Sequence, residues 1–237
     1  MLIGYKDDLD KNLVQSYTNT GVVHIIAISG MHLALIYALL LLITKPIRRK
    51  QLILLRIVLV LSGLWLFTFL AGAQASVVRS AVMFSCIALG EALVRKTFIY
   101  NTLALSAFVL LCINPFWLWD VGFQLSYAAV ASIVTFYKPI YHWMYLPNKA
   151  LDFIWKTTAI SIAAQILTTP ISLYHFHQFP VLFLLTNIVA VPLSGLILFG
   201  EIFLCSVSWV TAFAKLSGDL IKLLIYWMNS YIERIES

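Results

Sequence analysis

Hydrophobic residues in this chain occur in long blocks separated by short polar stretches. Val22–Thr44, Leu52–Gly72 and Val181–Val210 each reach or exceed the roughly 20 apolar residues that cross the core of a bilayer. We therefore predict an all-α fold, a polytopic transmembrane helix bundle with about seven spans. The predicted spans are residues 22–44, 52–72, 76–94, 98–118, 121–138, 153–174 and 181–209.

The segments on either side of this bundle are more polar. Residues 1–21 lack the basic start and short apolar core of a secretory signal peptide, and they predict an amphipathic lead-in. Residues 211–237 place apolar residues such as Leu220 and Trp227 at helical spacing beside Asp219 and Lys222. We expect this last segment to form an amphipathic helix on the cytoplasmic side, after a transmembrane domain of residues 22–210.

Prolines interrupt the helical pattern at three places. Asn114-Pro115 ends the fourth span early, Pro170 lies in the sixth span, and Pro192 lies in the middle of the long seventh block. Backbone groups freed by a proline must find partners in protein or water, so broken helices often line a substrate path, although a simple kink is commoner. The seventh block is either one kinked helix or two half-helices forming a re-entrant turn.

The composition excludes a water-soluble fold. Of the 237 residues, 62% are hydrophobic and 11% are charged, where a soluble domain has about 45–50% and about 25%. The three cysteines, Cys86, Cys112 and Cys205, all lie within apolar runs and offer neither a disulfide framework nor metal-binding spacing. We therefore interpret them as small hydrophobic residues.

Basic residues gather in alternate connections between the spans. Nine follow the first, third and fifth spans, whereas the other connections hold only Arg79. The nine are Lys45, Arg48, Arg49, Lys50, Arg95, Lys96, Lys138, Lys149 and Lys156. The positive-inside rule places these connections in the cytoplasm, so the predicted protein is multi-pass, starts outside and ends inside. The net charge of +6 is then mainly a signal of topology.

Two histidines of the first span are candidate site residues. His24 and His32 lie eight residues apart, on one broad face of a helix but about 12 Å apart along its axis, too far to share a metal ion. Ser29 and Gly30 between them permit close approach of another helix or a ligand. The histidines either bond neighbouring helices or contact a substrate in a pore.

Other polar residues within the spans predict an internal cavity that opens outward. Arg79 at the start of the third span either reaches the outer interface or faces a wet interior. Asp120, Gln124 and Tyr127 crowd the outer end of the fifth span. The sixth span carries a polar stripe of Ser161, Gln165, Thr168 and Ser172. We expect Arg79, His32, Gln124, Gln165 and Thr168 to face one shared cavity.

Glu201 is the remaining candidate. It is surrounded by apolar residues in the seventh span, so it needs a partner from another helix or a raised pKa. The chain has no phosphate-binding glycine loop, zinc-protease helix, serine elbow or cluster of carboxylates. We therefore predict a conduit rather than an enzyme, with no catalytic residue, metal or cofactor.

Four segments resemble the competence domain of the ComEC family in sequence, order and spacing. They are HIIAISGMHLAL at residues 24–35, SVVRSAVM at 76–83, NPFWLWDVGFQLSY at 114–127 and FPVLFLLTNIVAVPL at 179–193. The resemblance runs from about Gly4 to the last span. It implies a channel in the bacterial inner membrane that passes single-stranded DNA into naturally transformable cells.

The resemblance also implies partners. They are single-stranded DNA, the lipid bilayer, a DNA receptor and a cytoplasmic motor ATPase, and a second copy of the chain is a further candidate. Family members commonly carry a soluble amino-terminal domain and a metallo-β-lactamase-like carboxyl-terminal domain. This sequence holds neither, nor a His-x-His-x-Asp-His cluster, so the expectation is that it has no nuclease activity.

Two other classes of function compete with a DNA channel. A secondary transporter for a small solute or ion would use Glu201 and the interrupted seventh block as a polar site at the membrane midplane. A membrane-embedded enzyme would use His24 and His32, and it is the least favoured because no third ligand or nucleophile stands at a suitable spacing.

Overall fold

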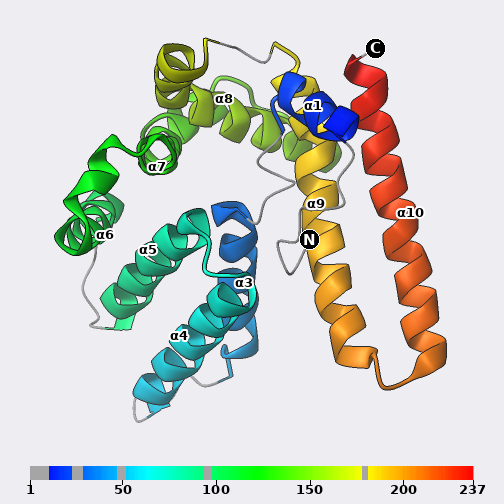
Figure 1. The fold of residues 1–237 in the computed structure, drawn as a ribbon, viewed down its shortest axis with the longest axis horizontal. Coiled ribbons are helices and arrows are strands. Elements are labelled where there is room, and N and C mark those ends of the chain that lie inside the picture. The colour runs from blue at the N-terminus through cyan, green and yellow to red at the C-terminus, as the bar shows by residue number, and fades with distance from the viewer. Residues whose placement is uncertain (1–10, 23–28, 47–51, 93–97, 178–180, 237) are drawn as a thin grey trace. The chain divides into compact units, whose positions relative to one another are not determined.

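The structure is a computed structural model that describes residues 11–22, 29–46, 52–92, 98–177 and 181–236. Every regular element in these ranges is a helix, as predicted (Figure 1). The elements are α1 Lys11–Asn19, α3 Gly30–Ile43, α4 Ile53–Leu70, α5 Ala75–Ala92, α6 Ile99–Ile113, the 3₁₀ helix η2 Pro115–Trp119, α7 Val121–Tyr141, α8 Lys149–Phe176, α9 Phe183–Val207 and α10 Thr211–Glu236. His24 lies outside the described residues.

Three of the described helices, α4, α8 and α9, are long and apolar enough to cross a membrane. This is fewer than the seven predicted spans. The 14 residues of α3 measure about 21 Å at 1.5 Å per residue, less than the roughly 30 Å of a bilayer core. α6 stops after 15 residues, and α7 is long enough but too polar.

The proline predictions have mixed outcomes. α6 ends at Ile113, as predicted, and the Asn114 side chain accepts a hydrogen bond from the Phe116 backbone N–H at 3.0 Å to start η2. Pro170 and Pro192, in contrast, lie inside continuous helices. The seventh block is therefore one helix, α9, so of the two alternatives left open by the sequence the single helix is correct. A proline removes one backbone bond, whereas the remaining turns of a 25-residue helix stay bonded.

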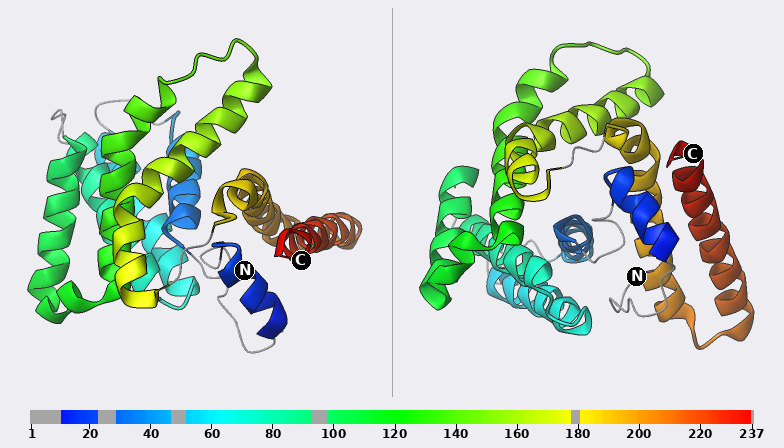
Figure 2. Two further views of the ribbon diagram at one scale, coloured as in Figure 1. Left: turned by 90° about the horizontal axis from the view of Figure 1, so that it is seen from above. Right: turned by 45° about the horizontal axis from the view of Figure 1, so that its top comes forward.

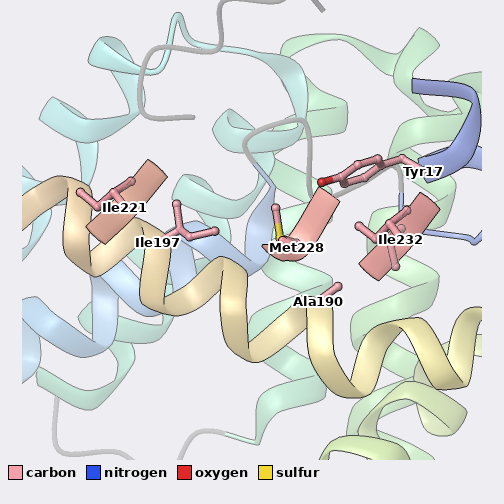
Figure 3. Close-up of a cluster of buried hydrophobic side chains, with 7 residues drawn as sticks. Tyr17, Ala190, Ile197, Ile221, Met228 and Ile232 are labelled. Atoms are coloured by element: carbon pink, nitrogen blue, oxygen red, sulfur yellow. The ribbon is translucent and has the colours of Figure 1, made fainter. Parts of the chain in front are cut away.

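The described residues form two compact units. The first contains α1, the first half of α8, α9 and α10. Here α9 and α10 run antiparallel, side by side (Figures 1 and 2). Tyr17, Ala190, Ile197, Met228 and Ile232 belong to the buried cluster that joins α1, α9 and α10 (Figure 3). α10 confirms the predicted terminal helix, and its position on the cytoplasmic side of the membrane stays a prediction.

A polar contact closes the edge of this cluster. The Tyr17 hydroxyl donates to Asn229 Oδ1 at 2.6 Å, and burial raises the pKa of Tyr17 to about 12. A phenol that keeps its proton can keep donating, so the raised pKa maintains the contact between α1 and α10 through the ordinary titration range of tyrosine, about pH 10.

The second unit contains α3, α4, α5, α6, η2, α7 and the second half of α8. Within it α5 packs against α3, α4, α6 and α7. Between α7 and α8, the Ser132 hydroxyl donates to the Ala163 carbonyl and accepts from the Leu167 backbone N–H at 3.2 Å. This packing places the first turns of α5 between α3 and α7, and it is there that Arg79 and Asp120 meet.

Candidate functional site

The first turn of α3 lies very close to α5. A Cβ added to Gly30 would stand 2.6 Å from Ser80 Oγ, so only glycine allows this approach. Ser80 Oγ in turn donates to the Ser76 carbonyl at 3.0 Å. The sequence prediction that Gly30 permits close helix packing is confirmed, and the partner is the residue next to Arg79.

His32 closes the cap of the same helix. Its Nδ1 accepts a hydrogen bond from the Ser29 backbone N–H at 3.2 Å and lies 3.0 Å from Ser29 Oγ. Because a backbone N–H can only donate, Nδ1 is the acceptor in its contact with the Ser29 N–H. The side chain is buried. Ser29 and His32 thus act together at the helix start, at the spacing of a capping box.

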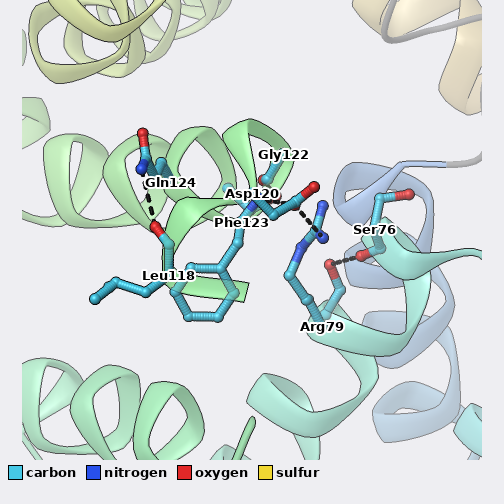
Figure 4. Close-up of polar contacts among 9 residues, drawn as sticks. Ser76, Arg79, Leu118, Asp120, Gly122, Phe123 and Gln124 are labelled. Atoms are coloured by element: carbon cyan, nitrogen blue, oxygen red, sulfur yellow. Dashed lines mark hydrogen bonds and ion pairs between the residues drawn. The ribbon is translucent and has the colours of Figure 1, made fainter. Parts of the chain in front are cut away.

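Arg79 is buried between α5 and the start of α7. Only 9% of its side chain is exposed, and Nη1 lies 3.4 Å from Asp120 Oδ1, in a pair whose carboxylate is half exposed. Its Nη2 lies 3.0 Å from where a Cβ of Gly122 would stand, so this glycine admits the guanidinium (Figure 4). Nε has no hydrogen-bond partner among the described residues. The Arg79 side chain is therefore packed between helices, and a wet interior around it stays a prediction.

Asp120 is also the N-cap of α7. Its Oδ1 accepts from the Phe123 backbone N–H at 2.7 Å, and the Gln124 side chain donates to the Leu118 carbonyl at 2.9 Å (Figure 4). One carboxylate oxygen therefore serves both the helix cap and the arginine. These two bonds fix the turn between η2 and α7.

These contacts bring together the amino-terminal turns of three helices, α3, α5 and α7. Each helix start carries roughly half a positive elementary charge from its unpaired N–H groups. Arg79 adds a full positive charge at the same place, and among the described residues Asp120 is the carboxylate that pairs with it. An arrangement of this kind favours a bound anion such as a phosphate.

The remaining predicted residues form separate contacts. The Tyr127 hydroxyl donates to Ser106 Oγ at 3.1 Å. Gln165 Oε1 accepts from Thr168 and Thr169 of its own helix at 3.3 and 3.2 Å. Among the described residues, no hydrogen bond or ion pair joins Gln165 or Thr168 to Arg79. The cavity expected to be shared by Gln165, Thr168, His32, Gln124 and Arg79 stays a prediction.

Glu201 lies in the first unit, on a polar line along α9. Asn187, Ser194 and Glu201 recur every seven residues and so share one face of the helix; the first two are buried and Glu201 is half-buried. The sequence analysis missed Asn187 and Ser194, although their heptad spacing from Glu201 was readable. The sequence pattern also gave no role to Ser80, because the importance of Ser80 depends on which helices touch. No group of three metal-ligating side chains occurs in the described part of the chain.

The Gly30 contact gives a testable prediction. Gly30→Ala should lower stability by about 1–3 kcal/mol, because the new methyl group displaces Ser80 Oγ from its bond to Ser76. Ser80→Ala removes the clashing oxygen, and the Ser80 Cβ at 3.6 Å is an ordinary contact. The double variant should therefore regain most of the loss in thermal unfolding in detergent. Equal stability of single and double variants would contradict this packing.

Comparisons with known proteins agree with the sequence resemblance. The model of the competence protein family matches residues 1–237. ComE operon protein 3 of Bacillus subtilis (strain 168) is 32% identical over 243 residues, which cover 99% of this chain and 29% of that protein. The chain thus spans less than a third of the length of this relative. No solved structure matches the chain. The match along the entire chain shows that it belongs to the competence protein family.

Proposed function

We propose that this chain is the membrane subunit through which single-stranded DNA enters a bacterial cell during natural transformation. Family membership supports a role in competence, and three helices suited to crossing a membrane support a place in the inner membrane. The observation that carries the DNA assignment is the cluster of three helix starts around buried Arg79. It concentrates positive charge and N–H donors, which are the groups that bind phosphate.

The Arg79–Asp120 pair suits a passing strand better than a fixed ligand. Its 3.4 Å separation is longer than the roughly 2.7–2.9 Å of a strong charge-assisted hydrogen bond. Because Asp120 is half exposed, a phosphate can replace it at the guanidinium and then give way to it again. Asp120 thus keeps each phosphate contact short-lived, and the strand can slide.

Aromatic side chains beside this cluster suit the bases. Phe116 and Trp119 of η2 are each 79% exposed, and Trp119 directly precedes Asp120. Bases of single-stranded nucleic acids stack on such rings, and each stacked base contributes about 1–3 kcal/mol to the binding free energy. Exposed aromatic rings next to a phosphate contact can bind single-stranded DNA of any sequence, because every base can stack on them.

The remaining parts of the assignment follow from the same proposal. The chain acts as a conduit and not as an enzyme, and it works with a DNA receptor outside and a motor ATPase inside. Assembly with a second copy is part of the proposal as well.

The direct test uses a transformable host made deficient in this chain and then supplied with it again. Restored entry of labelled DNA into a nuclease-resistant pool, in step with transformation frequency, is the expected result. Normal DNA entry in the deficient host would refute the proposal.

A secondary transporter for a small solute or ion is the alternative function. The observation that favours it is the line of Asn187, Ser194 and Glu201 on α9, since polar groups at membrane depth mark solute and ion paths. Glu201→Gln distinguishes the two functions. A transporter would lose solute uptake with this variant, whereas the DNA path through the second unit would keep its transformation frequency.

The proposed orientation places Lys149 in the cytoplasm and the turn between α4 and α5 outside. In a background with Cys86, Cys112 and Cys205 replaced, Lys149→Cys should resist an impermeant thiol reagent in intact cells. Ala73→Cys, exposed in that turn, should react and serves as the control. Labelling of position 149 from outside would contradict the proposed orientation.

A further inference from the structure

A pocket opens between α3, α4 and α5, near the loop that joins α3 to α4. Its cavity volume is about 60 Å³ and it is partly open to its surroundings, so it is a shallow groove along the helices rather than an enclosed ligand site. Leu41, Ile57, Val60 and Ala88 make its apolar wall, and Tyr37 and Arg56 also line it. None of the residues of the Arg79 cluster lines it.

Arg56 gives this apolar pocket a cationic end. It lies in the first turn of α4, and its Nε donates to Thr44 Oγ1 at 3.4 Å. Thr44 ends α3, and its hydroxyl donates to the Leu40 carbonyl at 2.7 Å. Arg56 therefore stands at the loop end of the pocket, where α3 stops and α4 begins.

Arg56 has no carboxylate neighbour in the described parts of α3 and α4. No aspartate or glutamate occurs in the sequence between Asp10 and Glu91, so the described parts of α3 and α4 offer no carboxylate. Lys45, which is exposed, follows Thr44 directly. A cationic end with no acidic neighbour in these helices, above an apolar wall, is complementary to an amphiphile with an anionic head.

The apolar wall is accessible from the lipid side of α4. Leu54, Leu55, Val58 and Leu59 of this helix are all exposed, and α4 is one of the helices long and apolar enough to cross a membrane. A chain that lies along this exposed face can pass into the pocket without crossing a polar surface. Water or a small polar solute would gain little from such a wall.

We propose that this pocket binds one anionic phospholipid, with its phosphate on Arg56 and Lys45 and part of an acyl chain against Leu41, Ile57 and Val60. Basic pockets between membrane helices at the cytoplasmic leaflet have the chemistry that recognises acidic lipid headgroups. The bound lipid bridges the end of α3 and the start of α4, which the Arg56–Thr44 hydrogen bond also links. This site is independent of the DNA path.

The test compares lipids bound to the purified full chain. Native mass spectrometry and thermal unfolding in neutral detergent are used, with phosphatidylglycerol, phosphatidylcholine or inorganic phosphate added. Phosphatidylglycerol should be retained and should raise the unfolding midpoint, whereas phosphatidylcholine and phosphate should do so at least about fivefold more weakly. Equal effects of both lipids, or of phosphate alone, would overturn the proposal.

Variants separate the headgroup from the acyl chain. Arg56→Gln should weaken phosphatidylglycerol binding about fivefold, and Arg56→Lys should keep most of it, because one cation near a membrane surface contributes about that factor. Lys138→Gln, which removes an exposed charge from the last turn of α7, is the matched control and should change nothing. Ile57→Asn should lose lipid binding while its lipid-free unfolding midpoint stays near that of the parent. Full binding by Arg56→Gln would refute the site.

Discussion

Replacing Arg79 with alanine should lower transformation frequency roughly a hundredfold, as expected for the loss of a charged hydrogen bond to phosphate worth up to about 3 kcal/mol. The protein should still insert into the membrane. Asp120 is half exposed and keeps its bond to the Phe123 N–H, so the substitution leaves no buried carboxylate without a partner. Transformation counts together with immunoblots of the membrane fraction measure both effects.

Arg79→Lys distinguishes a role in binding from a role in packing. Lysine keeps the charge but loses the fork that lets one nitrogen contact Asp120 while others stay available. A phosphate contact predicts activity between that of the parent and that of Arg79→Ala. If lysine fails as badly as alanine and both variants unfold early, Arg79 only joins α5 to α7. If Arg79→Ala transforms like the parent, the DNA site lies elsewhere.

Substitution of Asp120 should give the second large effect, because its Oδ1 both caps α7 and pairs with Arg79. Asp120→Ala removes the N-cap of α7 and leaves the buried guanidinium without a carboxylate, with a combined cost of about 2 kcal/mol. The cost stays below that of a fully buried pair because half of the Asp120 side chain is in contact with solvent. Thermal unfolding in detergent should show the drop, and DNA uptake should fall with the amount of folded protein.

Asp120→Asn is the matched comparison. Asparagine caps helices as well as aspartate does, so this variant should recover the cap contribution of about 1 kcal/mol while still removing the charge. Without the Asp120 carboxylate to compete for the guanidinium, Arg79 should hold a phosphate longer. Single-stranded DNA should then stabilise Asp120→Asn more than the parent, measured as the shift in unfolding midpoint. An equal or smaller shift would contradict the exchange of Asp120 with phosphate.

Several local features could be predicted from the sequence because they depend on neighbours along the chain. Apolar blocks gave the helical fold, and Asn114-Pro115 fixed the end of α6. The spacing of apolar residues beyond Thr211 predicted α10. The polar crowding after Asp120 predicted a polar start to α7, where Asp120 is the cap. Each of these outcomes needs only bonds or packing within a few turns.

The sequence misjudged features that depend on competition between local and longer-range forces. The number of predicted spans was too high, because a block of apolar residues does not show where its helix starts. The helix α3, for example, begins only at Gly30. The sequence left open whether Pro192 breaks its helix, and the turns on both sides of it stay bonded in one helix. A proline marks a lost hydrogen bond, and whether the helix continues depends on the bonds around it.

The sequence by itself determined the helical class, the family resemblance and the residue types available for a polyanion path. Tertiary structure decided which of those residues meet. Arg79 and Asp120 are 41 positions apart, and Gly30 meets Ser80 across 50, so no local pattern could pair them. Packing of α3 and α7 on α5 brings three helix starts to one arginine and leaves Gln165 bonded within its own helix. Charge acts through distance in space, and that distance is set by which helices pack together.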